Sequence, residues 1–121
     1  MDCCDRVIFI SDFLTKIGKW DGYEKYAVVG TYSKYEDQPT SVYNSKTRKV
    51  YKLDGSDDTC LHYSYGKWHV SSCDDIGTWY QWMYSDYTSE ICVGGVKTWT
   101  YLGTMDVSAK LEVKCIECKL K

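Results

Sequence analysis

A chain of 121 residues with 15 basic and 17 acidic side chains has the length of one domain and little net charge. This balance argues against a nucleic-acid binder, which normally presents a basic face, and no apolar run approaches the roughly 20 residues that span a bilayer. Aromatic residues make up 16% of the chain, which favours strands. We therefore expect a single domain over residues 1–121, without membrane insertion.

The first predicted element is an apolar run over residues 6–14. Its apolar side chains do not alternate cleanly with polar ones, as is typical of a strand covered on both faces. A short helix beginning at Ser11 is the alternative, because Leu14 and Ile17 follow Ile10 at helical spacing and Gly18 could end the helix. Both interpretations stay open from the sequence.

Two further segments with strand character precede the centre of the chain. Residues 26–32 are predicted to form a strand, in which Gly30 indicates a bulge or a close backbone approach. Residues 41–43 and 48–53 are predicted to form a hairpin across the polar segment 44–47.

The stretch 59–73 predicts a hairpin that turns at Tyr65 and Gly66. Gly66 supplies the positive φ that two-residue turns need, although Tyr65 suits such a turn poorly and a longer loop is the alternative. Apolar residues then face apolar ones and polar face polar, as expected when one face of the hairpin is buried. The predicted pairs are Leu61 with Val70 and Tyr63 with Trp68 on one face, and His62 with His69 and Ser64 with Lys67 on the other.

The last third of the chain adds the remaining strands. Residues 76–84 form the most aromatic segment, and residues 99–102 a short strand. Strict alternation of apolar and polar residues from Val107 to Cys115 predicts a strand with one buried face. About eight short strands, with turn signals roughly every eight to twelve residues, predict an all-β fold: an antiparallel β-sandwich or barrel.

Seven cysteines in so short a chain indicate a disulfide framework and a secreted, extracellular protein. Disulfides that tie the two termini together, plus one in the middle, would staple the domain. The odd number leaves at least one thiol free or paired between chains. Reduced structural thiols are one alternative. A zinc site is another, with Cys115 and Cys118 as a CxxC pair completed by Cys3 and Cys4, although adjacent cysteines fit such a site poorly.

Several short motifs follow one another in the order of a small repeated module. They are Gly30-Thr31-Tyr32, Ser41-Val42-Tyr43, Val50-Tyr51-Lys52, Leu61-His62-Tyr63, Gly66 to Val70, Cys92 seven residues before Trp99, and Leu111 to Cys115. Together they resemble a small aromatic-rich module that recurs, often in tandem, in extracellular multidomain and receptor-like proteins of marine invertebrates. The resemblance covers most of the chain from about Cys4 to Cys115, departs from the module at Val93, where proline is expected, and leaves Cys60, Cys73 and Cys118 as additions. It implies an extracellular setting and a binding role, with no catalytic residues.

We expect neither catalysis nor a cofactor. The sequence holds no hydrolase, P-loop or dinucleotide-binding pattern. Cys60 and His62 share a face, but a cysteine in an oxidised framework is not a thiolate. The acidic pairs Asp57-Asp58 and Asp74-Asp75 are adjacent in turns rather than opposed across a cleft.

The two histidines are weak candidates for a metal site. Directly opposed residues of an antiparallel pair have Cβ atoms about 5 Å apart, so His62 and His69 could share one metal ion, with Asp57, Asp58 or Asp74 as a third ligand. The alternative interpretation is two partly exposed histidines on the polar face of the hairpin.

The most aromatic segment supplies the candidate ligand-binding residues. Tyr80, Trp82 and Tyr84 would form one stripe of a strand, and Trp79, Gln81 and Met83 the other. A stripe left outside would be an exposed aromatic patch, beside His62 and His69, suited to a glycan. Lectin-like carbohydrate binding is therefore the first hypothesis. A protein–protein adhesion or self-association module, possibly a homodimer, is the second, and a structural domain is the third. Alternatively, both stripes are buried and the function lies in loops.

Overall fold

The computed structural model describes residues 4–17, 28–35, 48–76, 81–90, 92–101, 103 and 105–117. The predictions for Tyr26, for the strand at 41–43, for Trp79 and Tyr80, and for Cys3 and Cys118 lie outside these residues. None of the described helices is long and apolar enough to cross a membrane.

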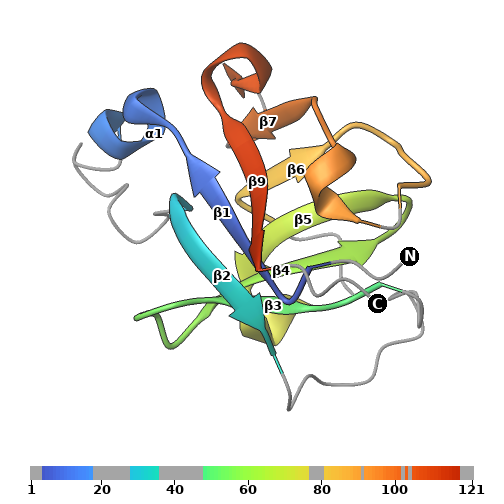
Figure 1. The fold of residues 1–121 in the computed structure, drawn as a ribbon. Coiled ribbons are helices and arrows are strands. Elements are labelled where there is room, and N and C mark those ends of the chain that lie inside the picture. The colour runs from blue at the N-terminus through green and yellow to red at the C-terminus, as the bar shows by residue number, and fades with distance from the viewer. Residues whose placement is uncertain are drawn as a thin grey trace.

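The described residues form one antiparallel sheet of nine strands, which Figure 1 shows curled into a half-barrel. Its order is β8-β7-β6-β5-β4-β3-β2-β1-β9, so every neighbour is consecutive in the chain except that the last strand pairs with the first. The all-β prediction is confirmed. The strands are β1 (Arg6–Ile10), β2 (Gly30–Lys34), β3 (Tyr51–Leu53), β4 (Thr59–Ser64), β5 (Lys67–Ser72), β6 (Met83–Ser85), β7 (Trp99–Tyr101), β8 (Met105–Asp106) and β9 (Glu112–Glu117).

Among the residues that the structure describes, helical structure is limited to short connections. The helix α1 (Asp12–Ile17) follows β1, and its first turn is capped by Ser11, whose Oγ accepts a hydrogen bond from the Leu14 N–H at 3.0 Å. The helical alternative after Ile10 is therefore the one that forms. The described part of the chain also has the 3-10 turns η2 (Cys73–Asp75), η3 (Val93–Gly95) and η4 (Ser108–Lys110).

The predicted strand from Val107 to Cys115 is wrong in its first half. The Asp106 carboxylate accepts hydrogen bonds from the N–H and the hydroxyl of Ser108, at 3.0 and 2.7 Å. Such local side-chain bonds stabilise a turn against a strand, and η4 forms there. The strand β9 begins only at Glu112.

The central hairpin has the predicted register, pair by pair. Leu61 faces Val70, Tyr63 faces Trp68, and the polar pairs lie between them. Tyr65 and Gly66 have φ values of 53° and 80°, so a two-residue turn with positive φ at both positions connects β4 and β5.

The main core fills the concave side of the half-barrel. Phe9 of β1 lies 5.1 Å from the ring of Tyr32 on β2 and 5.3 Å from that of Trp99 on β7. Because β1 and β7 are far apart in the sheet, only its curvature brings Phe9 and Trp99 together (Figure 1).

A smaller buried cluster lies on the opposite face of the hairpin. It consists of Val50, Cys60 and Ile76, with Tyr35 and Cys73 packed against it. The Cys60–Cys73 disulfide joins β4 to η2 and confirms that the domain is stapled in its middle. Cys92 is disulfide-bonded as well. Cys115 is an exposed free thiol on β9, as the odd cysteine count requires of at least one residue.

Candidate functional site

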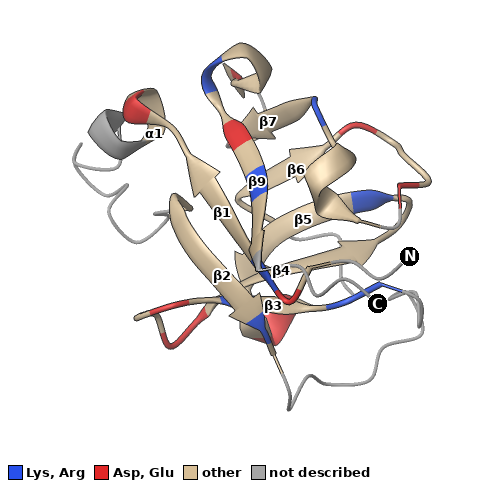
Figure 2. Cartoon of the chain, in the orientation of Figure 1, with Lys and Arg blue, Asp and Glu red and all other residues tan. Residues whose placement is uncertain are grey.

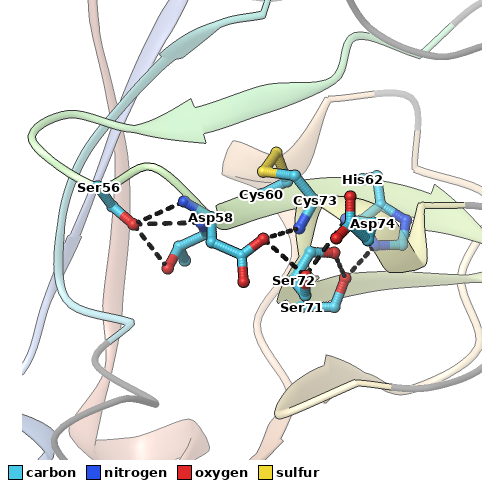
Figure 3. Close-up of a disulfide and its surroundings, with 9 residues drawn as sticks. Ser56, Asp58, Cys60, His62, Ser71, Ser72, Cys73 and Asp74 are labelled. Atoms are coloured by element: carbon cyan, nitrogen blue, oxygen red, sulfur yellow. Dashed lines mark hydrogen bonds between the residues drawn. A yellow bond between two sulfur atoms is a disulfide. The ribbon is translucent and has the colours of Figure 1, made fainter.

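The two histidines of the hairpin are buried, which corrects the expectation that they lie on a partly exposed polar face. His62 is 0% and His69 2% exposed, and their rings stack 5.4 Å apart. On this face of the hairpin Cys60 packs with Ile76 and Cys73, which follow β5. Figure 3 shows His62 beside the turn that carries Cys73 and Asp74, with the disulfide next to it.

Hydrogen bonds fix the state of the pair. The hydroxyl of Ser71 donates to Ser72 O at 2.9 Å and so accepts from Nε2 of His62, which is 2.7 Å away (Figure 3). Nδ1 of His62 then accepts from the Ser64 hydroxyl at 3.2 Å. His69 Nε2 donates to Ser64 O at 2.9 Å.

Both histidines are neutral at neutral pH. Burial, reinforced by His69, lowers the pKa of His62 to about 3. Burial also lowers the pKa of His69 to about 4; the hydrogen bond to Ser64 O opposes this shift, and the charge of Lys67 adds to it.

The described residues offer the metal hypothesis no third ligand. Among them, no group of three or more His, Cys, Asp or Glu is placed to hold a metal ion. Both ring nitrogens of His62 and Nε2 of His69 are hydrogen-bonded to serines or a carbonyl. The Asp58 carboxylate accepts from the Ser72 hydroxyl at 2.7 Å instead.

Trp79 and Tyr80 lie outside the described residues, but Gln81 and Trp82 precede β6, which begins only at Met83, so the predicted strand does not extend over them. Met83 is fully buried in the main core, and Trp82 is half-buried against it. Gln81 is half-buried, as is Tyr84. The structure therefore brings His69 and Tyr84 together, opposite each other on β5 and β6, whereas Trp82 packs against the main core.

Among the described residues, the exposed aromatic side chains lie elsewhere, at the tip of the hairpin. Tyr87 is 79% and Tyr65 42% exposed. We call Tyr65, Gly66, Lys67, Tyr84 and Tyr87 the hairpin-tip patch. Tyr87 is not among the predicted site residues because it is a single aromatic in a polar segment without a strand pattern. The sequence offers one local signal. Tyr87 is a large aromatic residue in a segment of Asp, Ser and Thr, and an exposed aromatic ring does not improve solubility.

The ring of Tyr87 packs closely against the backbone of the turn at Gly66. A Cβ atom at Gly66 would lie 3.1 Å from Cδ1 of Tyr87, and Gly66 has a φ of 80°. Glycine is therefore needed at this position for two reasons, the left-handed backbone and the ring that lies on it.

The loop that carries Tyr87 is held rigidly. Thr88 N donates to Gly66 O at 2.9 Å, and the Tyr63 hydroxyl donates to Thr88 O at 2.6 Å. The Trp68 indole N–H and the Arg48 guanidinium both donate to Glu90 O, at 3.2 and 3.1 Å. Because these bonds reach the main chain of the loop, the position of Tyr87 is set before any ligand arrives.

Lys67 supplies the charge of the patch. Its Nζ lies 4.6 Å from the ring centroid of Tyr84 and 4.5 Å from that of Tyr87. The Tyr84 hydroxyl donates to Gly103 O at 3.3 Å, which fixes the ring of Tyr84 beside the ammonium. Figure 2 shows that charges of both signs are otherwise spread over loops and strands.

A second surface depression, between the end of β1 and η4, is a weaker candidate. It is lined by Ile10, Phe13, Lys110 and Leu111, among others. The Lys110 ammonium lies 4.0 Å from the centroid of the Phe13 ring, and Phe13 is itself only half-exposed. The hairpin-tip patch instead has an aromatic ring mostly open to solvent.

No family model matches the chain, and neither a curated protein nor a solved structure is similar to it. The resemblance noted above rests on its sequence motifs, and the function has to be inferred from the geometry of the site.

Proposed function

We propose that the protein is a non-enzymatic extracellular recognition module that binds carbohydrate, with the hairpin-tip patch as its site. The observation that carries the proposal is Tyr87, a ring 79% exposed on a loop whose backbone is tied to the strands. The Cys60–Cys73 disulfide is compatible with an oxidising, extracellular compartment.

Each part of the patch matches a need of sugar recognition. A tyrosine ring combines an apolar face with a polar edge, and the apolar face of a pyranose packs against it while the sugar hydroxyls remain at the rim. The Lys67 ammonium is a hydrogen-bond donor next to that ring. Because the loop is ordered beforehand, binding does not have to order it. One ring of this size supports weak affinity, on the order of millimolar for a single sugar unit.

The test is a titration of the oxidised protein with a panel of oligosaccharides, followed by chemical-shift changes at the hairpin tip. We expect shifts at residues 65–67 and 84–88, lost in Tyr87→Ala. The matched control is Ile116→Ala, which removes another exposed apolar side chain, 43% exposed on β9. A response that persists in Tyr87→Ala, or none for any sugar, would refute the proposed site.

Self-association is the second candidate function, and Cys115 is the observation that favours it. This exposed thiol lies on β9, a terminal strand of the sheet, next to the exposed Ile116. Terminal strands pair readily with other chains. Sedimentation with and without a reductant tests this function: a reductant-sensitive dimer that Cys115→Ser abolishes supports it, and a monomer in both conditions refutes it.

A further inference from the structure

The ammonium group of Lys67 is held between two aromatic rings without a carboxylate partner. Its distances to the centroids of Tyr84 and Tyr87 are 4.6 and 4.5 Å. None of the ion pairs in the described part of the chain includes Lys67. Ring quadrupoles attract a cation but carry no net charge, so the positive charge of the patch is not neutralised by these contacts.

The other charged groups near the patch do not supply the missing anion. The Asp106 carboxylate accepts from Ser108 at 2.7 Å, and Oε2 of Glu90 lies 2.7 Å from where a Cβ atom of Gly95 would be. Asp86 is exposed and forms no ion pair with Lys67 among the described residues. The Arg48 side chain donates to Ser89 O and Glu90 O, whereas the described contacts of the Lys67 ammonium are with the two aromatic rings.

We infer that the hairpin-tip patch selects an anionic glycan, whose carboxylate or sulfate group binds the Lys67 ammonium while its sugar ring stacks on Tyr87. This inference rests on the proposed function and narrows its ligand class. A charge-assisted hydrogen bond is shorter and roughly twice as strong as a neutral one. The two rings also hold the lysine side chain in place, so less side-chain freedom is lost when the anion binds.

The experiment compares matched ligands by calorimetric titration: a uronic-acid oligosaccharide, a sulfated neutral oligosaccharide, its desulfated counterpart, and inorganic sulfate. We expect at least one anionic sugar to bind about tenfold or more tightly than the desulfated one, and a rise from about 50 to 300 mM salt to weaken it. The two anionic sugars distinguish carboxylate from sulfate recognition.

Variants separate the inference from the proposed function. Lys67→Met keeps the aliphatic stem and should abolish the preference for anionic sugars, whereas Lys67→Arg should largely retain it. Lys34→Met, which removes an exposed lysine from β2, is the control for net charge and should behave like the unmodified protein. Tyr87→Ala should weaken the binding of anionic and neutral sugars alike.

Each outcome decides between the two ideas. If desulfated and sulfated sugars bind equally and both depend on Tyr87, the anionic ligand is refuted and the lectin function survives. If inorganic sulfate binds as tightly as the sulfated sugar, the site is a simple anion site and the inference fails. If no saccharide binds the folded protein, both are refuted.

Discussion

His62 and His69 stack on each other across the central hairpin, with their ring centroids 5.4 Å apart and neither side chain exposed to solvent by more than 2%. Two imidazoles in such a place are stable only as neutral rings, because a buried charge without a partner is costly. The pair therefore couples the stability of the hairpin to pH.

We predict that the free energy of unfolding falls as the pH drops below about 6.5. The folded-state pKa values are lowered from 6.5 to about 3 for His62 and about 4 for His69, so the unfolded chain binds protons first. Stability is full above pH 6.5 and decreases until the folded-state values are reached. At pH 5 each histidine should cost on the order of 2 kcal/mol. Urea unfolding at pH 7.5, 6 and 5 measures this loss, and His69→Gln should roughly halve it. An equal slope in both proteins would contradict the prediction.

The hydrogen bond from His62 to Ser71 predicts a second effect on stability. Ser71→Ala leaves the buried Nε2–H of His62 without its acceptor at 2.7 Å, which should cost about 1–3 kcal/mol. Ser89→Ala, at an exposed position, should change stability by less than about 0.5 kcal/mol. Thermal or urea unfolding of the two variants at pH 7.5 is the measurement, and similar losses in both would rule out the role of this bond.

Two glycines allow the effect of the contact between Tyr87 and Gly66 to be separated from the effect of backbone strain. Gly66 and Gly55 have φ values of 80° and 82°, but a Cβ at Gly66 would meet Tyr87 at 3.1 Å whereas one at Gly55 would meet nothing within 4 Å. Both Gly→Ala changes should cost on the order of 1 kcal/mol of stability. Gly66→Ala should in addition displace Tyr87 and weaken sugar binding several-fold, which Gly55→Ala should not. Equal sugar binding by the two variants would show that the contact between Tyr87 and Gly66 does not affect binding.

Removal of the Cys60–Cys73 disulfide should destabilise the domain without changing any residue of the hairpin-tip patch. Cys60 and Cys73 are separated by 13 residues, and closing a loop of about this length stabilises a protein by about 3 kcal/mol. Cys60→Ala combined with Cys73→Ala should lose this amount in urea unfolding, while Cys115→Ser, at an exposed free thiol, should be nearly neutral. A double variant as stable as the unmodified protein would contradict the account.

The register of the hairpin was predictable because it depends on residues a few positions apart. Side chains alternate across a strand, so Leu61 and Val70 had to share a face once Gly66 fixed the turn. Which faces are buried was not predictable in this way. On the face that carries His62, Cys60 packs with Ile76 and Cys73, which follow β5, and a local pattern of polar residues carries no information about a segment that packs on it later.

The candidate site was less predictable than the fold. The density of aromatic residues predicted a site at residues 79–84, but Met83 lies in the main core. Tyr87 stands out only when exposure is known, and the placement of Lys67 between two rings depends on the pairing of β5 with β6. Such a cluster assembles residues from separate segments, which no spacing in the sequence records.

The loop at residues 86–90 is anchored through its main chain, by Thr88 N, Thr88 O, Ser89 O and Glu90 O. Residues at 86, 87 and 89 can consequently be exchanged without removing any of these anchors. The molecule thus separates the positions that hold the loop from those that face outward. Variants randomised at these three positions should stay folded while their ligand preference changes. The loop is therefore a convenient starting point for engineering new binders.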